Sequence, residues 1–221
     1  MDGMNATLRR ATIGSLCAAA TLALVLPVGA ARARDAARGE ALFELCAQCH
    51  GSDGGGDRAA LAPAIAGLPQ WFVEAQLHKF KNGARGSHFD DIGGMRMRPM
   101  SMWLRDDADV THVSAYVASL PRLELEPTLE GGDPESGKQK YAVCIACHGP
   151  NAQGNQALNA PPLAGMSDWY QLKSLENFKA GVRGTNPKDP TGALMRPMAL
   201  TLADAQAMLD VIAYIATLSQ P

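Results

Sequence analysis

The sequence is built from an internal repeat in which matched residues lie 98 positions apart, without a gap in the register. A Cys-x-x-Cys-His motif recurs, together with glycines, a proline, aromatic residues and two longer segments. The matched positions are Cys46, Cys49 and His50 (Cys144, Cys147 and His148), Gly39 (Gly137), Pro63 (Pro161), Gly67 (Gly165), Trp71 (Trp169), Phe80–Gly86 (Phe178–Gly184), Met97–Met100 (Met195–Met198), Tyr116 (Tyr214) and Leu120 (Leu218). A tandem duplication of one folding unit of about 90 residues explains this pattern.

The segment between the two copies is rich in proline, glycine and acidic residues, a composition typical of linkers. A chain of 221 residues has the length for one large domain or two small ones. We therefore predict two domains, at residues 34–120 and 134–221, joined by a linker at residues 121–133.

Each copy is predicted to be all-α, because apolar residues recur at helical spacing and no segment alternates with period two for long enough to form a sheet. Asp35 in one copy and Asp133 in the other are the expected caps of a first helix. The glycine runs 54–56 and 93–94 are expected to be loops. The predicted apolar helix faces are Val73, Leu77 and Phe80, with Leu172, Leu175 and Phe178 in the second copy, and Val110, Val113, Val117 and Leu120, with Met208, Val211, Ile215 and Leu218.

The N-terminus has the pattern of a secretory signal peptide. Arg9 and Arg10 precede a stretch, Ala11–Val28, that is almost free of charge, and Ala31-Arg32-Ala33 has the form of a cleavage site. We predict a signal peptide at residues 1–33 and a periplasmic protein, with cleavage after Ala30 as an alternative site. An uncleaved membrane anchor is the other interpretation. Peripheral association with a membrane is left open separately.

Charge and aromatic content limit the classes of function. Lys and Arg number 20 against 22 Asp and Glu, which excludes a strongly basic nucleic-acid-binding protein. Aromatic residues make up only 5% of the chain, so two small cores would be thin without additional apolar bulk. We expect a prosthetic group to supply that bulk.

Cys-x-x-Cys-His is the attachment signature of c-type haem. Cysteines three positions apart lie on one face of a helix, where their thiols can bond to the two vinyl groups of one porphyrin. The histidine that follows then faces the iron. Zinc binding is disfavoured because 94 residues separate Cys49 from Cys144, and a thioredoxin-like redox pair because a βαβ pattern is missing. Two covalent haems are therefore predicted, on Cys46 and Cys49 with His50, and on Cys144 and Cys147 with His148.

A methionine is the expected ligand on the other side of each iron, since its thioether is soft and neutral. Met97 and Met195 each begin a Met-Arg-Pro-Met segment, in which proline stiffens the predicted loop. Met100 and Met198 share the segment and are the chief rivals. The candidates without a counterpart are Met95, His78, His88 and His112. For the histidines an exposed or structural role is favoured, and a His-ligated haem in the first copy is left open.

The sequence resembles the diheme class I cytochromes c of the cytochrome c4 type. The resemblance is carried by CAQCHG and CIACHG, by the proline, Ala-Gly turn and tryptophan that follow, and by FK-x-G-x-RG and MRPM. It covers nearly all of residues 35–218. It implies two cytochrome c folds facing each other across a pseudo-twofold interface. By the family pattern, Met97 and Met195 are the iron ligands.

The resemblance also implies roles for residues around each haem. The carbonyls of Pro63 and Pro161 would accept hydrogen bonds from Nδ1–H of His50 and His148. The first and last helices would cross closely at Gly39 with Phe43 and Tyr116, and at Gly137 with Tyr141 and Tyr214. Because the two copies match without a gap, the two haem environments are expected to be unusually alike.

With histidine and methionine on both faces, each iron has no open position, so the chain is predicted to carry single electrons rather than to act as an enzyme. The expected partners are a quinol-oxidising complex or a dehydrogenase as donor and a terminal oxidase as acceptor, with no nucleic acid. The alternatives are a haem subunit of a periplasmic dehydrogenase complex, or a diheme enzyme acting on peroxide or a small sulfur compound. Such an enzyme would need an iron that lacks its methionine or has a stronger ligand.

Overall fold

The computed structural model describes Met1 and residues 28–218, with side chains from residue 35 onward in the second range. The charged and apolar parts of the predicted signal peptide, within residues 2–27, lie outside the described residues. In the first half the helices are α1 (Val28–His50), α2 (Gln70–Lys81), α3 (Ile92–Trp103) and α4 (Asp107–Ser119). In the second half they are α5 (Pro134–Tyr141), α6 (Ile145–His148), the 3₁₀ helix η1 (Gln156–Leu158), α7 (Asp168–Lys179), α8 (Pro190–Leu200) and α9 (Ala205–Ala216).

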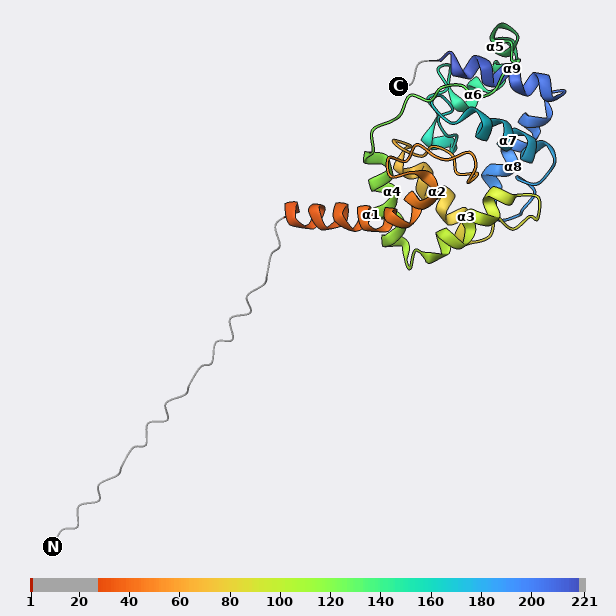
Figure 1. Cartoon of the computed structure of the whole chain (residues 1–221). Coiled ribbons are helices and arrows are strands. Elements are labelled where there is room, and N and C mark those ends of the chain that lie inside the picture. Colours follow the sequence, from red (N-terminus) through yellow and green to blue (C-terminus); the bar gives the residue numbers. More distant parts are fainter. Residues whose placement is uncertain (2–27, 219–221) are drawn as a thin grey trace.

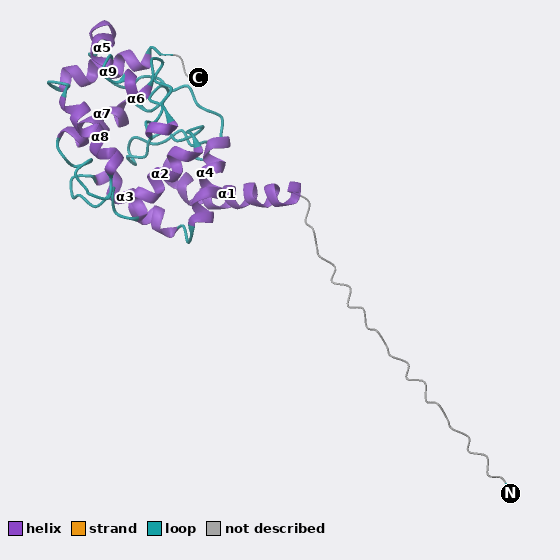
Figure 2. Cartoon of the chain, turned by 180° about the vertical axis from the view of Figure 1, so that it is seen from behind, coloured by secondary structure: helices purple, strands orange, loops and turns teal. Residues whose placement is uncertain are grey.

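The described residues form helices and loops without a strand, as predicted (Figure 2). The only pairings of the β type in that part of the chain are two isolated bridges, between Asp57 and Ala62 and between Asn155 and Ala160. These bridges occupy equivalent positions in the two copies. The two halves lie side by side (Figure 1), with the N-terminal part of α1 extending away from the body.

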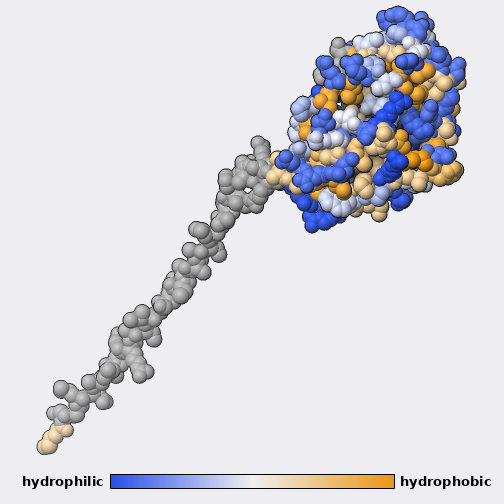
Figure 3. All heavy atoms as spheres, viewed as in Figure 1, coloured by the Kyte–Doolittle hydropathy of each residue, from blue (hydrophilic) through white to orange (hydrophobic). Residues whose placement is uncertain are grey.

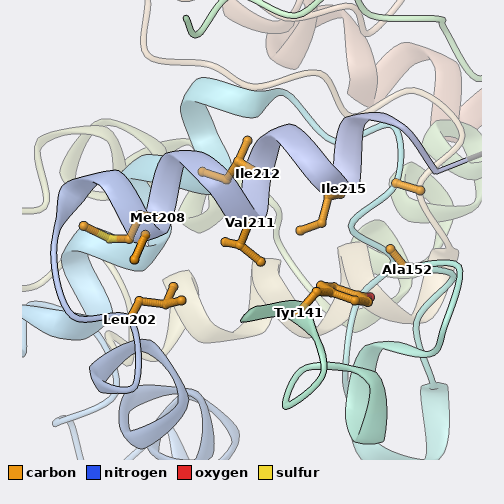
Figure 4. Close-up of a cluster of buried hydrophobic side chains, with 9 residues drawn as sticks. Tyr141, Ala152, Leu202, Met208, Val211, Ile212 and Ile215 are labelled. Atoms are coloured by element: carbon orange, nitrogen blue, oxygen red, sulfur yellow. The ribbon is translucent and has the colours of Figure 1, made fainter. Parts of the chain in front are cut away.

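Each half has its own apolar core, built on the first and last helices. In the first half α1 packs on α4, and α2 packs on α3 and α4; in the second half α5 packs on α9, and α7 on α8 and α9. The first core consists of Leu42, Phe43, Leu77, Leu104, Val110, Val113 and Val117. The second includes Tyr141, Ala152, Leu202, Met208, Val211, Ile212 and Ile215. In Figure 4 the side chains of Val211 and Ile215 point from α9 toward Tyr141, whereas Ile212 projects from the other side of the helix.

Glycine allows the first and last helices of each half to cross closely. A Cβ atom added to Gly137 would collide with the backbone carbonyl of Asp210 and lie 2.9 Å from Cβ of Tyr214. The ring of Tyr214 packs against that of Tyr141 at a centroid distance of 5.5 Å. Gly39 has the equivalent place against α4. The crossing implied by the resemblance is therefore confirmed in both copies.

The start of the first helix differs from the prediction in one copy. Asp133 caps α5, accepting a hydrogen bond from the backbone N–H of Glu135 at 2.9 Å. Asp35 does not cap α1, because that helix begins at Val28, seven residues earlier. The alanine-rich stretch before Asp35 has high intrinsic helix propensity and extends the helix backwards.

The glycine pair 93–94 and the Met-Arg-Pro-Met segments also lie in helices rather than in the predicted loops. Asp91 caps α3 by accepting the N–H of Gly94 at 3.1 Å. The carboxylate lies so close to Gly94 that a Cβ there would collide with it, so this glycine serves the cap rather than a loop. Pro99 interrupts the hydrogen bonds of α3 without ending the helix.

The segment that joins the two halves is fixed to the second half. The carboxylate of Asp168 accepts hydrogen bonds from the backbone N–H groups of Thr128 at 2.5 Å and Leu129 at 2.7 Å, and from the Thr128 hydroxyl at 2.8 Å. Arg122 donates to the carbonyl of Ala164. Burial raises the pKa of Asp168, but these hydrogen bonds outweigh it and hold that pKa below the ordinary value.

No single helix within the described ranges is both long enough and apolar enough to cross a membrane. Only α8 and α9 taken together meet the length and composition, and this pair is bent by 110° at its break.

Candidate haem sites

The first Cys-x-x-Cys-His motif lies in the last turns of α1 and lines a cavity. Cys46 and Cys49 are one helical turn apart, and His50 is the last residue of the helix. The cavity has a volume of about 590 Å³, within the range of pockets that enclose a prosthetic group. Its lining unites the predicted site residues of the first copy with apolar side chains of α2: Cys46, Cys49, His50, Met97, Val73, Leu77 and Phe80.

His50 is buried, and one hydrogen bond fixes its ring. Nδ1–H donates to the carbonyl oxygen of Pro63 at 2.7 Å, as the resemblance implies. Because a carbonyl oxygen only accepts, Nδ1 carries the proton and Nε2 presents a lone pair. Burial lowers the pKa of His50, although the hydrogen bond to Pro63 opposes this. The ring is therefore held neutral, the form in which histidine binds a metal.

The second copy repeats this arrangement on a different backbone. Nδ1–H of His148 donates to the carbonyl of Pro161 at 2.8 Å, and burial again lowers the pKa of the histidine. The helix is interrupted here: α5 ends at Tyr141, and Cys144 is the N-cap of the short helix α6. The hydroxyl of Tyr141 donates to the carbonyl of Gly149 at 2.8 Å and so links the end of α5 to the residue that follows α6.

Met97 and Met195 occupy equivalent places on α3 and α8, and both are half-buried. Met97 packs against the apolar core of the first domain and lines its cavity. The rivals Met100 and Met198 are more open, with 39% and 37% of their surface exposed, and Met100 also reaches the cavity wall. Burial thus favours the first methionine of each pair.

The unmatched candidates lie elsewhere. Met95 is exposed, and neither it nor the three histidines line the cavity. Each histidine instead faces a carboxylate: His78 lies 4.0 Å from Asp107, His88 3.8 Å from Asp90, and His112 3.4 Å from Asp35. These contacts agree with the surface or structural role favoured from the sequence.

The alternatives of a zinc site and a redox-active cysteine pair find no support. No group of three His, Cys, Asp or Glu side chains in the described part of the chain can hold a metal ion. Burial raises the pKa of Cys46 and Cys144 to about 11, whereas a reactive cysteine has a lowered pKa. The cysteines of both motifs are free of disulfides.

Buried arginines supply a second feature that fits haem. Four Nε–H groups, equivalent in pairs between the copies, are buried and have no hydrogen-bond partner among the described residues; they belong to Arg85, Arg98, Arg183 and Arg196. Buried donors are normally paired, so these need an acceptor from outside the chain. A haem carries two propionate carboxylates, the acceptors that guanidinium groups bind best.

Sequence reasoning assigned these arginines no role, although each lies in a segment that it recognised as repeated. Arg85 and Arg183 are held over aromatic rings, with guanidinium carbons 4.3 Å from the ring centroids of Phe80 and Phe178. In the sequence, an arginine that recurs in both copies close to a phenylalanine was the pattern that could have indicated a role at the haem.

The first cavity extends to the second domain. Trp169 and Tyr170 of α7 line it, and the hydroxyl of Ser167 accepts the N–H of Ala64 at 3.1 Å across the interface. Arg85 donates to the hydroxyl of Tyr170 at 3.1 Å. The site on one domain is therefore completed by side chains of the other.

This interface makes the two sites less alike than the matched register suggested. The residue equivalent to Tyr170 in the first copy is Phe72, which has no hydroxyl. Burial alone would raise the pKa of Tyr170, but Arg85 and Arg183 outweigh burial and lower it to about 8. The expectation of unusually similar haem environments is thus wrong at the domain interface, where contacts need not obey the repeat.

Comparison with known proteins agrees with this architecture. Residues 36–121 and 134–219 each match the family Cytochrome c. Cytochrome c4 of Azotobacter vinelandii is 31% identical over 203 residues, which cover 84% of this chain and 92% of that protein. The thiosulfate dehydrogenase electron acceptor of Stutzerimonas stutzeri is 32% identical over 171 residues, 69% of this chain and 71% of the relative.

A solved structure extends the comparison to three dimensions. Reduced recombinant cytochrome c4 from Pseudomonas stutzeri matches with a TM-score of 0.62 at 27% identity, covering 83% of this chain and 98% of that one. The predicted all-α fold of two tandem cytochrome c domains is confirmed, and with it two covalently bound haem c groups. The chain belongs to the cytochrome c family, as a diheme electron carrier of the cytochrome c4 type.

Proposed function

We propose that the chain is a periplasmic carrier that takes single electrons from a dehydrogenase or a quinol-oxidising complex and delivers them to a terminal oxidase. The observation that carries this proposal is the buried histidine of each motif, whose Nδ1 is tied to a proline carbonyl so that Nε2 is free to bind iron. The residues proposed to hold the haems are Cys46 and Cys49 with His50 and Met97, and Cys144 and Cys147 with His148 and Met195.

The bound haem iron supplies a reversible one-electron change between the ferrous and ferric states. The residues around each haem set the reduction potential at which this one-electron change occurs. A neutral methionine thioether stabilises the ferrous state and raises the potential, and the bond from His50 to Pro63 keeps the imidazole in one orientation. The apolar lining from Val73, Leu77 and Phe80 would limit the access of water to the bound haem.

The domain arrangement supports transfer between the haems. The first cavity is lined by both domains and reaches α7 of the second. The linker adds to this, because Asp168 holds it on the second domain. A fixed interface would hold the two haems at one distance, so that the rate of transfer between them would not vary with domain motion.

Export is proposed from the sequence pattern of residues 1–33. Cleavage after Ala33 would leave intact the contacts that hold α1 on α4. These begin with Asp35, whose carboxylate lies 3.4 Å from Nε2 of His112, and continue with Arg38, whose guanidinium lies 2.7 Å from the carboxylate of Asp109, and with Gly39. The mature chain would therefore keep the complete first domain.

Partner binding is supported by an exposed apolar face on the helix that carries Met97. Met95, Met102 and Trp103 of α3 are all exposed and do not line the cavity. Hydrophobic residues interrupt the hydrophilic surface on the face of the molecule seen in Figure 3. Such a face suits brief contact with a redox protein. A relative that serves as electron acceptor of a thiosulfate dehydrogenase supports a dehydrogenase as one donor.

A test separates the carrier from the enzyme. The purified mature protein should show two reversible one-electron steps in a spectroscopic redox titration, and acid-acetone should extract no haem. Ferrous protein should bind carbon monoxide slowly at both irons, since the proposed histidine and methionine ligands would leave neither iron an open position. Rapid carbon monoxide binding at one iron would refute the carrier and favour an enzyme with an open site.

A further inference from the structure

Lys79 of α2 reaches from the first domain to the start of α8 in the second. Its ammonium group lies 2.7 Å from Oδ1 of Asp189 and 2.5 Å from the hydroxyl of Thr191. Asp189 is the N-cap of α8 and accepts the N–H of Gly192 at 2.9 Å. A charged group of one domain therefore binds the cap of a helix in the other.

Both charges are withdrawn from water. The side chain of Asp189 is 1% exposed and that of Lys79 is 19% exposed. Burial by itself raises the pKa of Asp189, but hydrogen bonds from Lys79 and Gly192 outweigh it and hold the pKa below its ordinary value. Removing the lysine would leave a buried carboxylate without its cation, which is far more costly than losing an exposed pair.

The same loop has two further bonds to the first domain. Nδ2 of Asn186 donates to the carbonyl of Gly83 at 2.9 Å, and the ammonium of Lys188 to that of Asn82 at 3.2 Å. These carbonyls follow the C-terminal end of α2, where acceptors are left unpaired by the helix. The start of α8 is thus docked on the end of α2.

The reverse contact is absent from the described structure. Asp91 caps α3 in the first domain and accepts the N–H groups of Gly94 and Gly86, yet none of the ion pairs between described residues includes it. The residue that matches Lys79 in the second copy is Asn177, which carries no charge. The first domain therefore holds a helix of the second through an ion pair, without a counterpart in the other direction.

We propose that Lys79 is a positioning residue for Met195: through Asp189 it fixes the register of α8 and so the approach of the thioether to the second iron. Met195 follows Asp189 by less than two helical turns, on the same rigid helix. This inference rests on the proposed ligation by Met195. Lys79 is not among the residues that line the first cavity, so its effect is expected chiefly at the second haem.

The test replaces Lys79 by the residue that the repeat itself uses, Lys79→Asn. In the wild type, the ferrous protein should give two upfield methionine methyl signals in its proton NMR spectrum, and Met195→Ala identifies the one from the second haem. Lys79→Asn should shift or broaden that signal and lower the potential of the second haem, leaving the first signal in place. Lys79→Arg should restore both values.

Controls distinguish positioning from simple loss of charge. Lys138→Asn removes an exposed lysine of α5 and should change neither signal nor potential. Asp189→Asn should reproduce the effect of Lys79→Asn, and adding Lys79→Asn to it should produce no further shift. Asp189→Asn also serves if Lys79→Asn does not fold.

Two failures are distinguishable. Absence of both methyl signals from the wild type would overturn the proposed ligation. Two signals in the wild type that stay unchanged in Lys79→Asn and Asp189→Asn would overturn the role of Lys79 alone. The same role would be overturned if Lys79→Asn shifted the potential of the second haem equally in the wild type and in Asp189→Asn.

Discussion

Replacing Gly137 by alanine tests the close crossing on which each haem domain is built. Gly137 lies inside α5, and alanine there would gain up to about 1 kcal/mol of intrinsic helix propensity. The added Cβ, however, would collide with the carbonyl of Asp210 and lie 2.9 Å from Cβ of Tyr214. Overpacking of this kind costs about 1–3 kcal/mol. Because the obstructing atoms are mostly backbone and cannot move aside, the cost should prevail.

We expect Gly137→Ala to reduce the free energy of unfolding by about 1–2 kcal/mol. With a slope of about 2 kcal/mol per molar urea, this lowers the unfolding midpoint by about 0.5–1 M. The assay is urea unfolding of the mature holoprotein followed by far-ultraviolet circular dichroism.

Gly93→Ala is the matched control. Gly93 also lies in a helix, but the nearest atoms to its added Cβ are in Leu61 at 3.6 and 3.8 Å, an ordinary contact distance. This variant should be as stable as the wild type or more stable by up to about 1 kcal/mol. The reasoning is refuted if Gly137→Ala is no less stable than the wild type, or if Gly93→Ala loses as much stability.

Two further sets of substitutions test the ligands and the linker. Met97→Ala or Met195→Ala should each remove about half of the thioether-to-ferric-iron absorption band and lower the potential of one haem; if Met100→Ala does this instead of Met97→Ala, the ligand is Met100. Asp168→Asn should destabilise the fold by about 1–3 kcal/mol at neutral pH, because Thr128 loses a charged acceptor. Since folding lowers the pKa of Asp168, its contribution is complete above the unfolded value of about 4 and is lost as pH falls through the lower folded value. The difference in unfolding free energy between wild type and Asp168→Asn should therefore shrink below pH 4, and a difference that stays constant there would contradict the assignment.

Features that depend on neighbours in sequence were predictable. The Cys-x-x-Cys-His motif placed both histidines, and the resemblance to the cytochrome c4 type, together with the repeat of Pro63 at Pro161, implied the proline carbonyls that bind them. The apolar spacing located α2 and α4, with Gly83 just beyond the end of α2. These features were accessible because their spacing follows directly from helix geometry or from the duplication.

Predictions from local composition were wrong where a tertiary contact requires a residue in a structure that it does not usually form. Glycine pairs normally indicate a loop, yet Gly94 lies in α3 because the carboxylate of Asp91 needs its space. Contacts across the interface left no pattern at all. Lys79 and Asp189 are 110 positions apart, and only the folded chain shows that they meet.

The interface explains how a duplicated chain can hold two unequal redox centres. Contacts within a domain recur because duplication copies both partners together, as with each histidine and its proline. A contact between domains occurs twice only if both copies keep both partners. Phe72 in place of Tyr170 removes the counterpart of the Arg85–Tyr170 bond, and Asn177 in place of Lys79 removes the counterpart of the Lys79–Asp189 ion pair, so both missing contacts are those that would run from the second domain to the first. The two haem sites therefore have unequal neighbours across the interface, and because their proposed ligands are the same, we expect these unmatched residues to set the difference in potential between the two haems.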